Sequence, residues 1–148
     1  MTTTAPTTNG RVIALAHYAA RAVLESVLTR HGLTFQQSVT LRAVALAGGT
    51  VGREQLVADV INSLKIEESL VRDVVEEMTA AKLLEAAPAD PTLLRLSAAG
   101  QELSDTTAAE TAEASTRIYA GIPDEDLAVA GRVLALVTER ANAELARA

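Results

Sequence analysis

The chain is rich in apolar residues but almost lacks aromatic ones, and this combination restricts its fold more than any other feature. Hydrophobic residues make up 49% of the 148 positions, yet only 2% are aromatic: two Tyr, one Phe and no Trp. A β-sandwich depends on aromatic and β-branched side chains. A core of Ala, Val, Leu and Ile at this length instead favours helices. The chain is also too short for two comfortable cores, so we expect one mostly helical domain.

Several classes of site are excluded by composition. The chain has no cysteine, which excludes disulfides, thiolate zinc sites and cysteine nucleophiles. With two histidines, a metal site would depend mainly on carboxylates, and we predict neither a metal nor a cofactor. The sequence contains no phosphate-binding glycine loop. The net charge of -6 has the wrong sign for a generic nucleic-acid binder.

The N-terminal segment MTTTAPTTNG is polar and rich in threonine. It lacks the basic and apolar regions of a secretory signal, and we expect residues 1–10 to form a disordered arm. No run of 18 apolar residues is free of charge, so we predict no membrane span and no membrane partner. The expected location is the cytoplasm.

Apolar spacing and chain-breaking residues predict the secondary structure. Thr34 and Gln37 form a capping-box pattern at the start of the second helix, and Asp124 is the expected N-cap of the last one. The fourth helix should bury Leu70 together with Val71, Val74, Val75 and Met78. Helices are expected over 11–31, 34–47, 53–64, 67–82, 97–119 and 125–146, with a β-hairpin over 83–96.

Three stretches carry a resemblance to a known family. Residues 60–71 (VINSLKIEESLV) have the residue pattern of a helix–turn–helix, which continues to KLLE at 82–85. Residues 94–103 (LRLSAAGQEL) match a wing strand that leads into a long helix. Residues 119–127 (YAGIPDEDL) match a link into a terminal helix. Their order and spacing resemble the MarR family of winged-helix regulators. The resemblance covers nearly all of 11–146.

The resemblance implies an all-α fold with a small β-hairpin wing, assembled as an intertwined homodimer. It divides the chain into the arm at 1–10, a helical dimerisation region at 11–47 and 101–148, and a winged helix–turn–helix lobe at 48–100. Family members bind pseudo-palindromic DNA and release it when a small, often aromatic, molecule enters a cavity between lobes. The DNA contacts would then come from Arg53, Lys65, Ser69 and Arg72.

The chain departs from the family where DNA would be read. The second helix of a helix–turn–helix enters the major groove by its N-terminal end, which here carries Glu67 and Glu68. The wing, residues 85–92, is shorter than usual and has no arginine at its tip, since Arg95 sits on the return strand. Residues 51–100 hold five basic and nine acidic side chains. Because phosphate neutralisation supplies much of protein–DNA affinity, this pattern opposes DNA binding.

Candidate ligand residues gather on the first helix. His17, Arg21 and Glu25 share one helix face, with Tyr18 beside them, and the resemblance places this helix along the cavity. His17, Tyr18, Arg21 and Arg42 would suit an aromatic acid or a phenolic molecule. His17, Tyr18 and Glu25 could instead perform acid–base catalysis. The alternative is an ordinary solvated face with an Arg21–Glu25 pair, and Arg42 as a surface charge.

Two functions remain open. The first, which the family resemblance favours, is a ligand-responsive regulator that binds DNA as a homodimer. The second is a repurposed protein of this fold that has lost DNA binding and binds or transforms a small metabolite. Fold alone does not decide between them, because function resides in the site.

Overall fold

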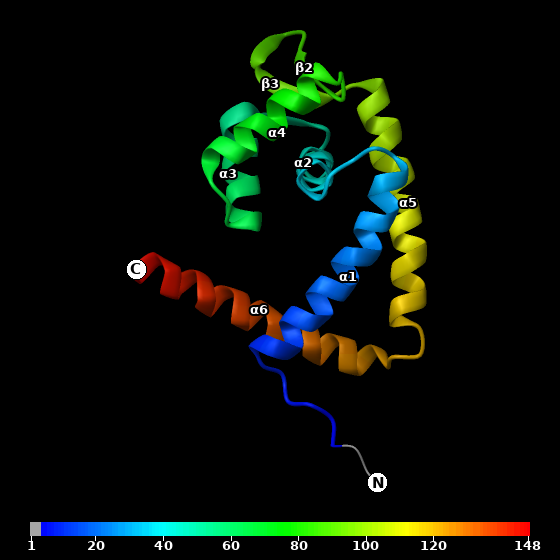
Figure 1. The fold of residues 1–148 in the computed structure, drawn as a ribbon. Coiled ribbons are helices and arrows are strands. Elements are labelled where there is room, and N and C mark those ends of the chain that lie inside the picture. The colour runs from blue at the N-terminus through cyan, green and yellow to red at the C-terminus, as the bar shows by residue number, and fades with distance from the viewer. Residues whose placement is uncertain (1–3) are drawn as a thin grey trace. The chain divides into compact units, whose positions relative to one another are not determined.

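The computed structural model describes residues 4–148 (Figure 1). The chain forms two compact units, residues 1–113 and 114–148. Residues 4–9 have no regular secondary structure and are exposed, and the rest of the predicted arm, residues 1–3, lies outside the described residues. The elements are α1 (Gly10–Arg30), α2 (Phe35–Leu46), β1 (Thr50–Gly52), α3 (Arg53–Leu64), α4 (Glu68–Ala80), β2 (Leu84–Ala87), β3 (Asp90–Leu96), α5 (Ala98–Tyr119) and α6 (Asp124–Arg147).

The helix ends follow local sequence chemistry. Asn9 caps α1, its side chain accepting a hydrogen bond from the Val12 amide. The predicted capping box is confirmed, since Thr34 accepts from the Gln37 amide and the Gln37 side chain accepts from the Thr34 amide. Gly32 follows α1 with a φ of 70°, a left-handed conformation that favours glycine. These short-range signals fix the angle at which the chain passes from α1 into α2.

The sheet has one strand more than the predicted hairpin. Its order is β1-β3-β2, and all neighbours are antiparallel. The short strand β1 pairs with β3 through Thr50 opposite Arg95 and Val51 opposite Leu94. Three residues are too few to show the alternation by which a strand is recognised in sequence. Strand β3 is therefore central, and the hairpin is anchored to the segment that follows α2.

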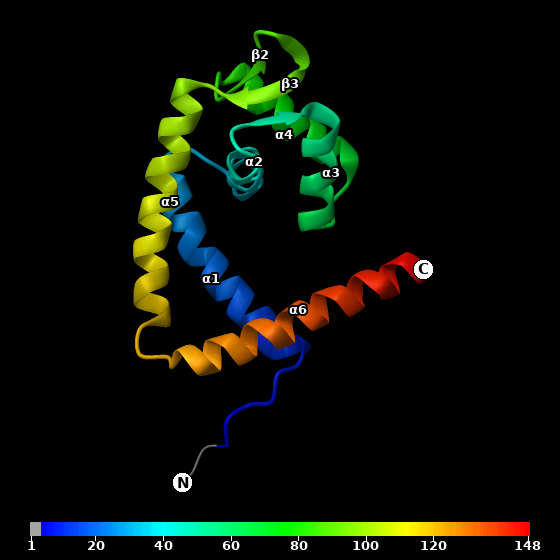
Figure 2. The same ribbon diagram turned by 180° about the vertical axis from the view of Figure 1, so that it is seen from behind.

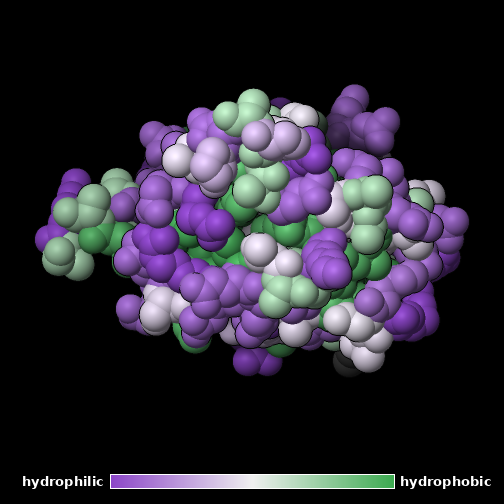
Figure 3. Space-filling model, turned by 90° about the horizontal axis from the view of Figure 1, so that it is seen from above, coloured by the Kyte–Doolittle hydropathy of each residue, from purple (hydrophilic) through white to green (hydrophobic). Residues whose placement is uncertain are grey.

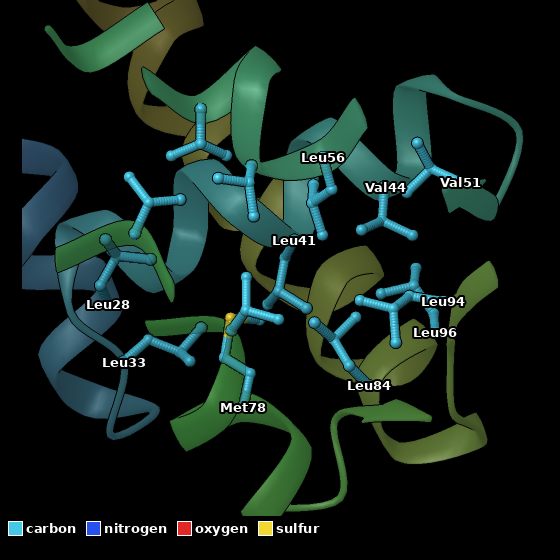
Figure 4. Packing of buried hydrophobic residues seen from close by; sticks show 14 residues of the cluster. Leu28, Leu33, Leu41, Val44, Val51, Leu56, Met78, Leu84, Leu94 and Leu96 are labelled. Atoms are coloured by element: carbon cyan, nitrogen blue, oxygen red, sulfur yellow. The ribbon is translucent and has the colours of Figure 1, made fainter. Parts of the chain in front are cut away.

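The core lies around α2, which contacts α1, α3, α4, β1 and β3 (Figure 2). Buried side chains from these elements point toward one another (Figure 4). Five of the hydrophobic ones are completely inaccessible to solvent: Val44, Leu56, Val71, Met78 and Leu94. The cluster comprises Leu28, Leu33, Leu41, Val44, Val51, Leu56, Val57, Val60, Val71, Val75, Met78, Leu84, Leu94 and Leu96.

One prediction about this core is wrong. Leu70 is 52% exposed, whereas α4 buries Val71, Val75 and Met78. Those three residues follow the spacing of a single helical stripe. Leu70 precedes Val71 by one position and is therefore rotated by about 100° away from that stripe. The narrow stripe leaves most of the α4 surface free to face solvent or a partner.

The junction between β3 and α5 brings two backbone segments into close contact. Ser97 Oγ donates a hydrogen bond to the Lys82 carbonyl at 2.6 Å, and the Ser97 amide donates to the Leu83 carbonyl at 3.0 Å. Gly100 packs against the same segment, and a Cβ atom there would overlap the Leu83 carbonyl oxygen. A glycine is therefore required in the first turn of α5.

The unit formed by residues 114–148 contains the end of α5 and all of α6. Helix α6 begins at Asp124, with Pro123 as its N-cap, so the predicted cap at Asp124 is displaced by one residue. The acidic residues Asp124, Glu125 and Asp126 occupy the first helical turn, where they complement the helix dipole. None of the 24 residues of α6 is buried. Its exposed apolar residues are Val129, Val133, Leu134, Leu136, Val137 and Leu145.

Helix α1 is also largely exposed, with only Val27 and Leu28 buried. By length and composition alone it is the one described helix that could cross a membrane. A span tolerates one or two charged residues, so the lack of a charge-free run does not exclude one. A core helix of a soluble protein and an N-terminal signal share these properties.

Candidate ligand site and DNA-reading face

Arg21 joins α1 to α2. Its guanidinium lies over the Phe35 ring, with Cζ 4.0 Å from the ring centroid, and its Nε donates a hydrogen bond to Glu25 Oε1 at 3.1 Å. Arg21, Glu25 and Phe35 are all half-buried. A cation above an aromatic face is attracted by the ring quadrupole. The expected Arg21–Glu25 ion pair is thus present, and the guanidinium also packs on the face of the Phe35 ring.

Phe35 is a component of this cluster that the sequence reasoning missed. It is the only phenylalanine of the chain and the first residue of α2. In a chain with three aromatic residues, a lone ring at the start of a helix is a signal worth pursuing. Its partner, however, lies 14 positions earlier on another helix, and only the α1–α2 turn brings the two together.

His17 and Tyr18 stand one turn before Arg21 on α1, and both side chains are exposed. Their ring centroids are 5.5 Å apart, and the ring planes are inclined by 58°. Four of the predicted residues, His17, Tyr18, Arg21 and Glu25, therefore lie on adjoining turns of one helix. They present an imidazole, a phenol and a guanidinium within one stretch of surface.

Arg42 lies apart from this group. It is exposed on α2, seven residues after Phe35. Seven residues are nearly two full turns, so both side chains share one face of α2, about 10 Å apart along its axis. Arg42 would therefore reach only a ligand that extends along α2. The partly buried Ser38 and Val39 occupy the same face between them.

The chemistry open to this group is binding more than catalysis. The Arg21 guanidinium keeps donors beyond its Nε–H, and these match the geometry of a carboxylate. Glu25 already accepts from Arg21, and it lies two helical turns from His17, so the two do not form an acid–base pair. Among residues 4–148, no group of three or more His, Asp or Glu side chains could hold a metal ion.

The turn between α3 and α4 is stabilised by Lys65. This residue ends α3 in the left-handed conformation, with a φ of 55°. Its Nζ donates hydrogen bonds to the carbonyl oxygen of Asn62 at 2.6 Å and to Asn62 Oδ1 at 3.0 Å. A cation at the C-terminus of a helix complements the helix dipole. The Lys65 ammonium therefore stabilises the C-terminal end of α3.

Arg72 is paired with two carboxylates. Its Nη1 and Nη2 donate to the two oxygens of Glu54, at 3.2 and 2.8 Å, and Nη2 also lies 3.3 Å from Glu68 Oε1. Hydrogen bonding by Arg72 lowers the pKa of Glu54, and the same bond raises the pKa of Arg72. Because Glu54 belongs to α3, these contacts tie α3 to α4. The Glu68–Arg72 spacing is visible in sequence, but the Glu54 contact is not.

The other two predicted DNA contacts have no carboxylate this close. Ser69 is exposed in the first turn of α4, and Arg53 is half-buried at the start of α3. The positive charge of Arg53 makes a smaller contribution to the lowered pKa of Glu54. The four predicted residues thus lie on α3, on α4 and at the turn between them. Of the four, Arg72 is the one whose charge is neutralised by carboxylates.

The wing offers little positive charge. Arg95 Nε donates to Glu85 Oε1 at 2.9 Å, across the β2–β3 pair. Near the tip, Asp90 Oδ1 accepts from the Thr92 hydroxyl at 2.6 Å and from the Thr92 amide at 2.9 Å, and these bonds lower the pKa of Asp90. Figure 3 views this region from above and shows hydrophilic residues around a hydrophobic centre.

Several solved structures share this arrangement of helices and strands. CouR from Rhodococcus jostii RHA1 bound to p-coumaroyl-CoA has a TM-score of 0.74 at 19% identity, covering 87% of this chain and 90% of that one. NadR in complex with 4-hydroxyphenylacetate has a TM-score of 0.71 at 20% identity, covering 93% and 98%. A MarR-family regulator from Rhodococcus sp. RHA1 has a TM-score of 0.71 at 19% identity, covering 87% and 92%.

The chain has the MarR-type winged-helix fold. No family model matches the sequence, and no curated protein matches it either. Within residues 4–148, six helices and a small antiparallel sheet confirm the predicted winged-helix fold, and the intertwined dimer stays a prediction. At these identities the likeness concerns the fold, and the roles of individual residues rest on the contacts described above.

One further ion cluster links two helices of the MarR-type fold. Glu110 on α5 accepts from Arg30 Nη2 at 2.9 Å and lies 3.1 Å from His31 Nε2. Hydrogen bonds from His31 and Arg30 hold the pKa of Glu110 below its ordinary value. His31 is also the C-cap residue of α1. The cluster fixes the end of α1 to α5.

Proposed function

We propose that the chain is a ligand-responsive transcriptional regulator of MarR type, acting in the cytoplasm as a homodimer and without a cofactor. The observation that supports this most strongly is the fold, which matches solved transcriptional regulators over 87% or more of the chain. Two of the similar structures contain phenolic ligands, 4-hydroxyphenylacetate and p-coumaroyl-CoA. The shared architecture supplies the DNA-reading helix, and the α1–α2 contact supplies candidate ligand groups.

The homodimer accounts for the apolar surface of the terminal helix. Helix α6 exposes Val129, Val133 and Val137, which recur at helical spacing, and buries nothing within one subunit. Exposed apolar stripes of this kind are typical of subunit interfaces. Light scattering should give twice the 15.5 kDa mass of the chain. A Val133→Glu variant should dissociate, whereas Asn142→Glu, on the opposite face of α6, should not.

The proposed ligand is a small aromatic or phenolic acid bound by His17, Tyr18, Arg21 and Arg42. Titration calorimetry with 4-hydroxyphenylacetate as the probe tests this site. Replacement of the guanidinium in Arg21→Gln should weaken binding about tenfold or more, because a charge-assisted pair is lost. Arg11→Gln is the matched control on the same helix. Equal affinities for the two variants would remove Arg21 from the site.

The proposed DNA contacts are Arg53, Lys65, Ser69 and Arg72. Arg72→Ala should abolish DNA binding while leaving the dimer intact. Arg140→Ala removes the same charge from α6 and should have little effect. Fluorescence anisotropy with a duplex from the region upstream of the gene measures both variants. An Arg72→Ala variant with unchanged affinity would contradict the assignment.

A second candidate function has a specific observation in its favour. Arg72 is held between two carboxylates, and the wing arginine is paired with Glu85. A protein of this fold that no longer reads DNA would bind or transform a metabolite with His17, Tyr18 and Glu25. In that case His17→Ala should remove binding or turnover without unfolding the chain. Mass spectrometry of the recovered probe distinguishes binding from turnover.

A further inference from the structure

We propose that Glu54 and Glu68 restrain Arg72 and thereby limit the affinity of this protein for DNA. The inference rests on the proposed function, since it concerns the DNA-reading face of the same regulator. The two glutamates, one on α3 and one on α4, would reduce DNA affinity through intramolecular ion pairs, called the brake below. Neither residue would touch DNA itself, and both would act through Arg72.

The contacts occupy the part of Arg72 that would read a base or a phosphate. A guanidinium has five N–H donors arranged as a fork. Glu54 takes the pair on Nη1 and Nη2, at 3.2 and 2.8 Å, and Glu68 takes a further Nη2 donor at 3.3 Å. Bidentate recognition of guanine or phosphate uses two adjacent donors of this fork. DNA must therefore displace at least one carboxylate before Arg72 can engage in this way.

The charge of the group opposes DNA as well. One guanidinium and two carboxylates carry a net charge of -1 at neutral pH. A free Arg72 would present a charge of +1 to the phosphates. Phosphate contacts by cations drive non-specific and much of specific affinity. The two glutamates thus change the net charge around Arg72 from +1 to -1.

The restraint is graded because the ion pairs are exposed. Side-chain exposure is 39% for Arg72, 75% for Glu54 and 63% for Glu68. Exposed pairs contribute little individually and are screened by salt. A suitable DNA site can therefore displace them, whereas weakly matched DNA cannot. The expected consequence is a raised threshold for binding instead of a complete block.

The test compares four forms of the full-length protein by fluorescence anisotropy. They are the wild type, Glu54→Gln/Glu68→Gln, the same pair combined with Arg72→Ala, and Glu67→Gln/Glu76→Gln. The last variant is the matched control, because it also removes two carboxylates from the helix–turn–helix but leaves both ion pairs of Arg72 in place. The probe is a duplex from the upstream region of the gene, titrated from low to physiological salt. Circular dichroism checks that each variant is folded.

The double variant should bind DNA about tenfold more tightly than the control, because one arginine per half-site becomes available. Its affinity should fall more steeply with salt, by about one phosphate contact for each released arginine. Addition of Arg72→Ala should abolish the gain. Equal gains in the double variant and the control would overturn the inference, because loss of charge would then suffice.

The outcomes also separate the inference from the proposed function. If the wild type binds no DNA even at low salt but the double variant does, the brake is real and the regulator hypothesis fails. If the wild type binds and the double variant binds more weakly, the glutamates position Arg72 for DNA, and the inference is overturned. If no form binds, both are overturned.

Discussion

The contact between Arg21 and Phe35 should contribute measurable coupling between α1 and α2. The guanidinium lies 4.0 Å from the ring centroid, and the Arg21 side chain is 33% exposed. Cation–π pairs contribute about 0.5–1 kcal/mol when exposed and about 2 kcal/mol when desolvated. A partly exposed pair at this short distance should therefore couple by about 1 kcal/mol. That value corresponds to a shift in Tm of about 3 °C for a chain of this size.

A double-mutant cycle measures this coupling separately from other losses. Phe35→Leu removes the ring and keeps most of the apolar volume, whereas Arg21→Gln also removes the Glu25 ion pair. The Glu25 contribution appears equally on both sides of the cycle and cancels. Urea unfolding gives the free energies, at one fixed protomer concentration because a dimer's stability depends on concentration. Additive effects, with coupling below about 0.3 kcal/mol, would refute the contact.

Three further predictions test the rest of the fold. Gly100→Ala should destabilise the protein by about 1–3 kcal/mol, because its Cβ would overlap the Leu83 carbonyl oxygen; an unchanged thermal midpoint would contradict this packing. Leu94→Ala, in the fully buried centre of β3, should cost about 2–5 kcal/mol in urea unfolding, and a small loss would show that β3 is not central. Glu110→Gln should lower the thermal midpoint at pH 7. Because the pKa of Glu110 is lowered by His31 and the neighbouring arginine, its stabilisation is present above the ordinary glutamate value and disappears as pH falls through the lowered pKa. A difference between wild type and variant that stays constant as the pH falls far below the ordinary glutamate pKa would count against that assignment.

The helices could be predicted because their signals are local. Thr34 and Gln37 are three residues apart, and each capping bond forms within one turn. Gly32 ends α1 through its own backbone conformation. The wing hairpin also forms between neighbouring segments. Such signals lie within a few positions of one another, so they can be recognised in the sequence.

The features that could not be predicted depend on residues that are far apart in the sequence. Strand β1 exists because Val51 pairs with Leu94, more than 40 positions later. Phe35 joins the candidate ligand group only through the α1–α2 turn, and Glu54 reaches Arg72 only when α3 packs on α4. Side-chain pairs of this kind follow from tertiary packing. The residues on one helix face were therefore predicted together, whereas their partners on other helices were not.

The most direct test of the regulator hypothesis is a DNA titration of the wild-type homodimer by fluorescence anisotropy. The labelled duplex comes from the upstream region of the gene, and a scrambled duplex of equal composition is the control. We predict binding to the first duplex that weakens with salt and exceeds binding to the second. Equal binding to both duplexes, or no binding to either at low salt, would contradict it.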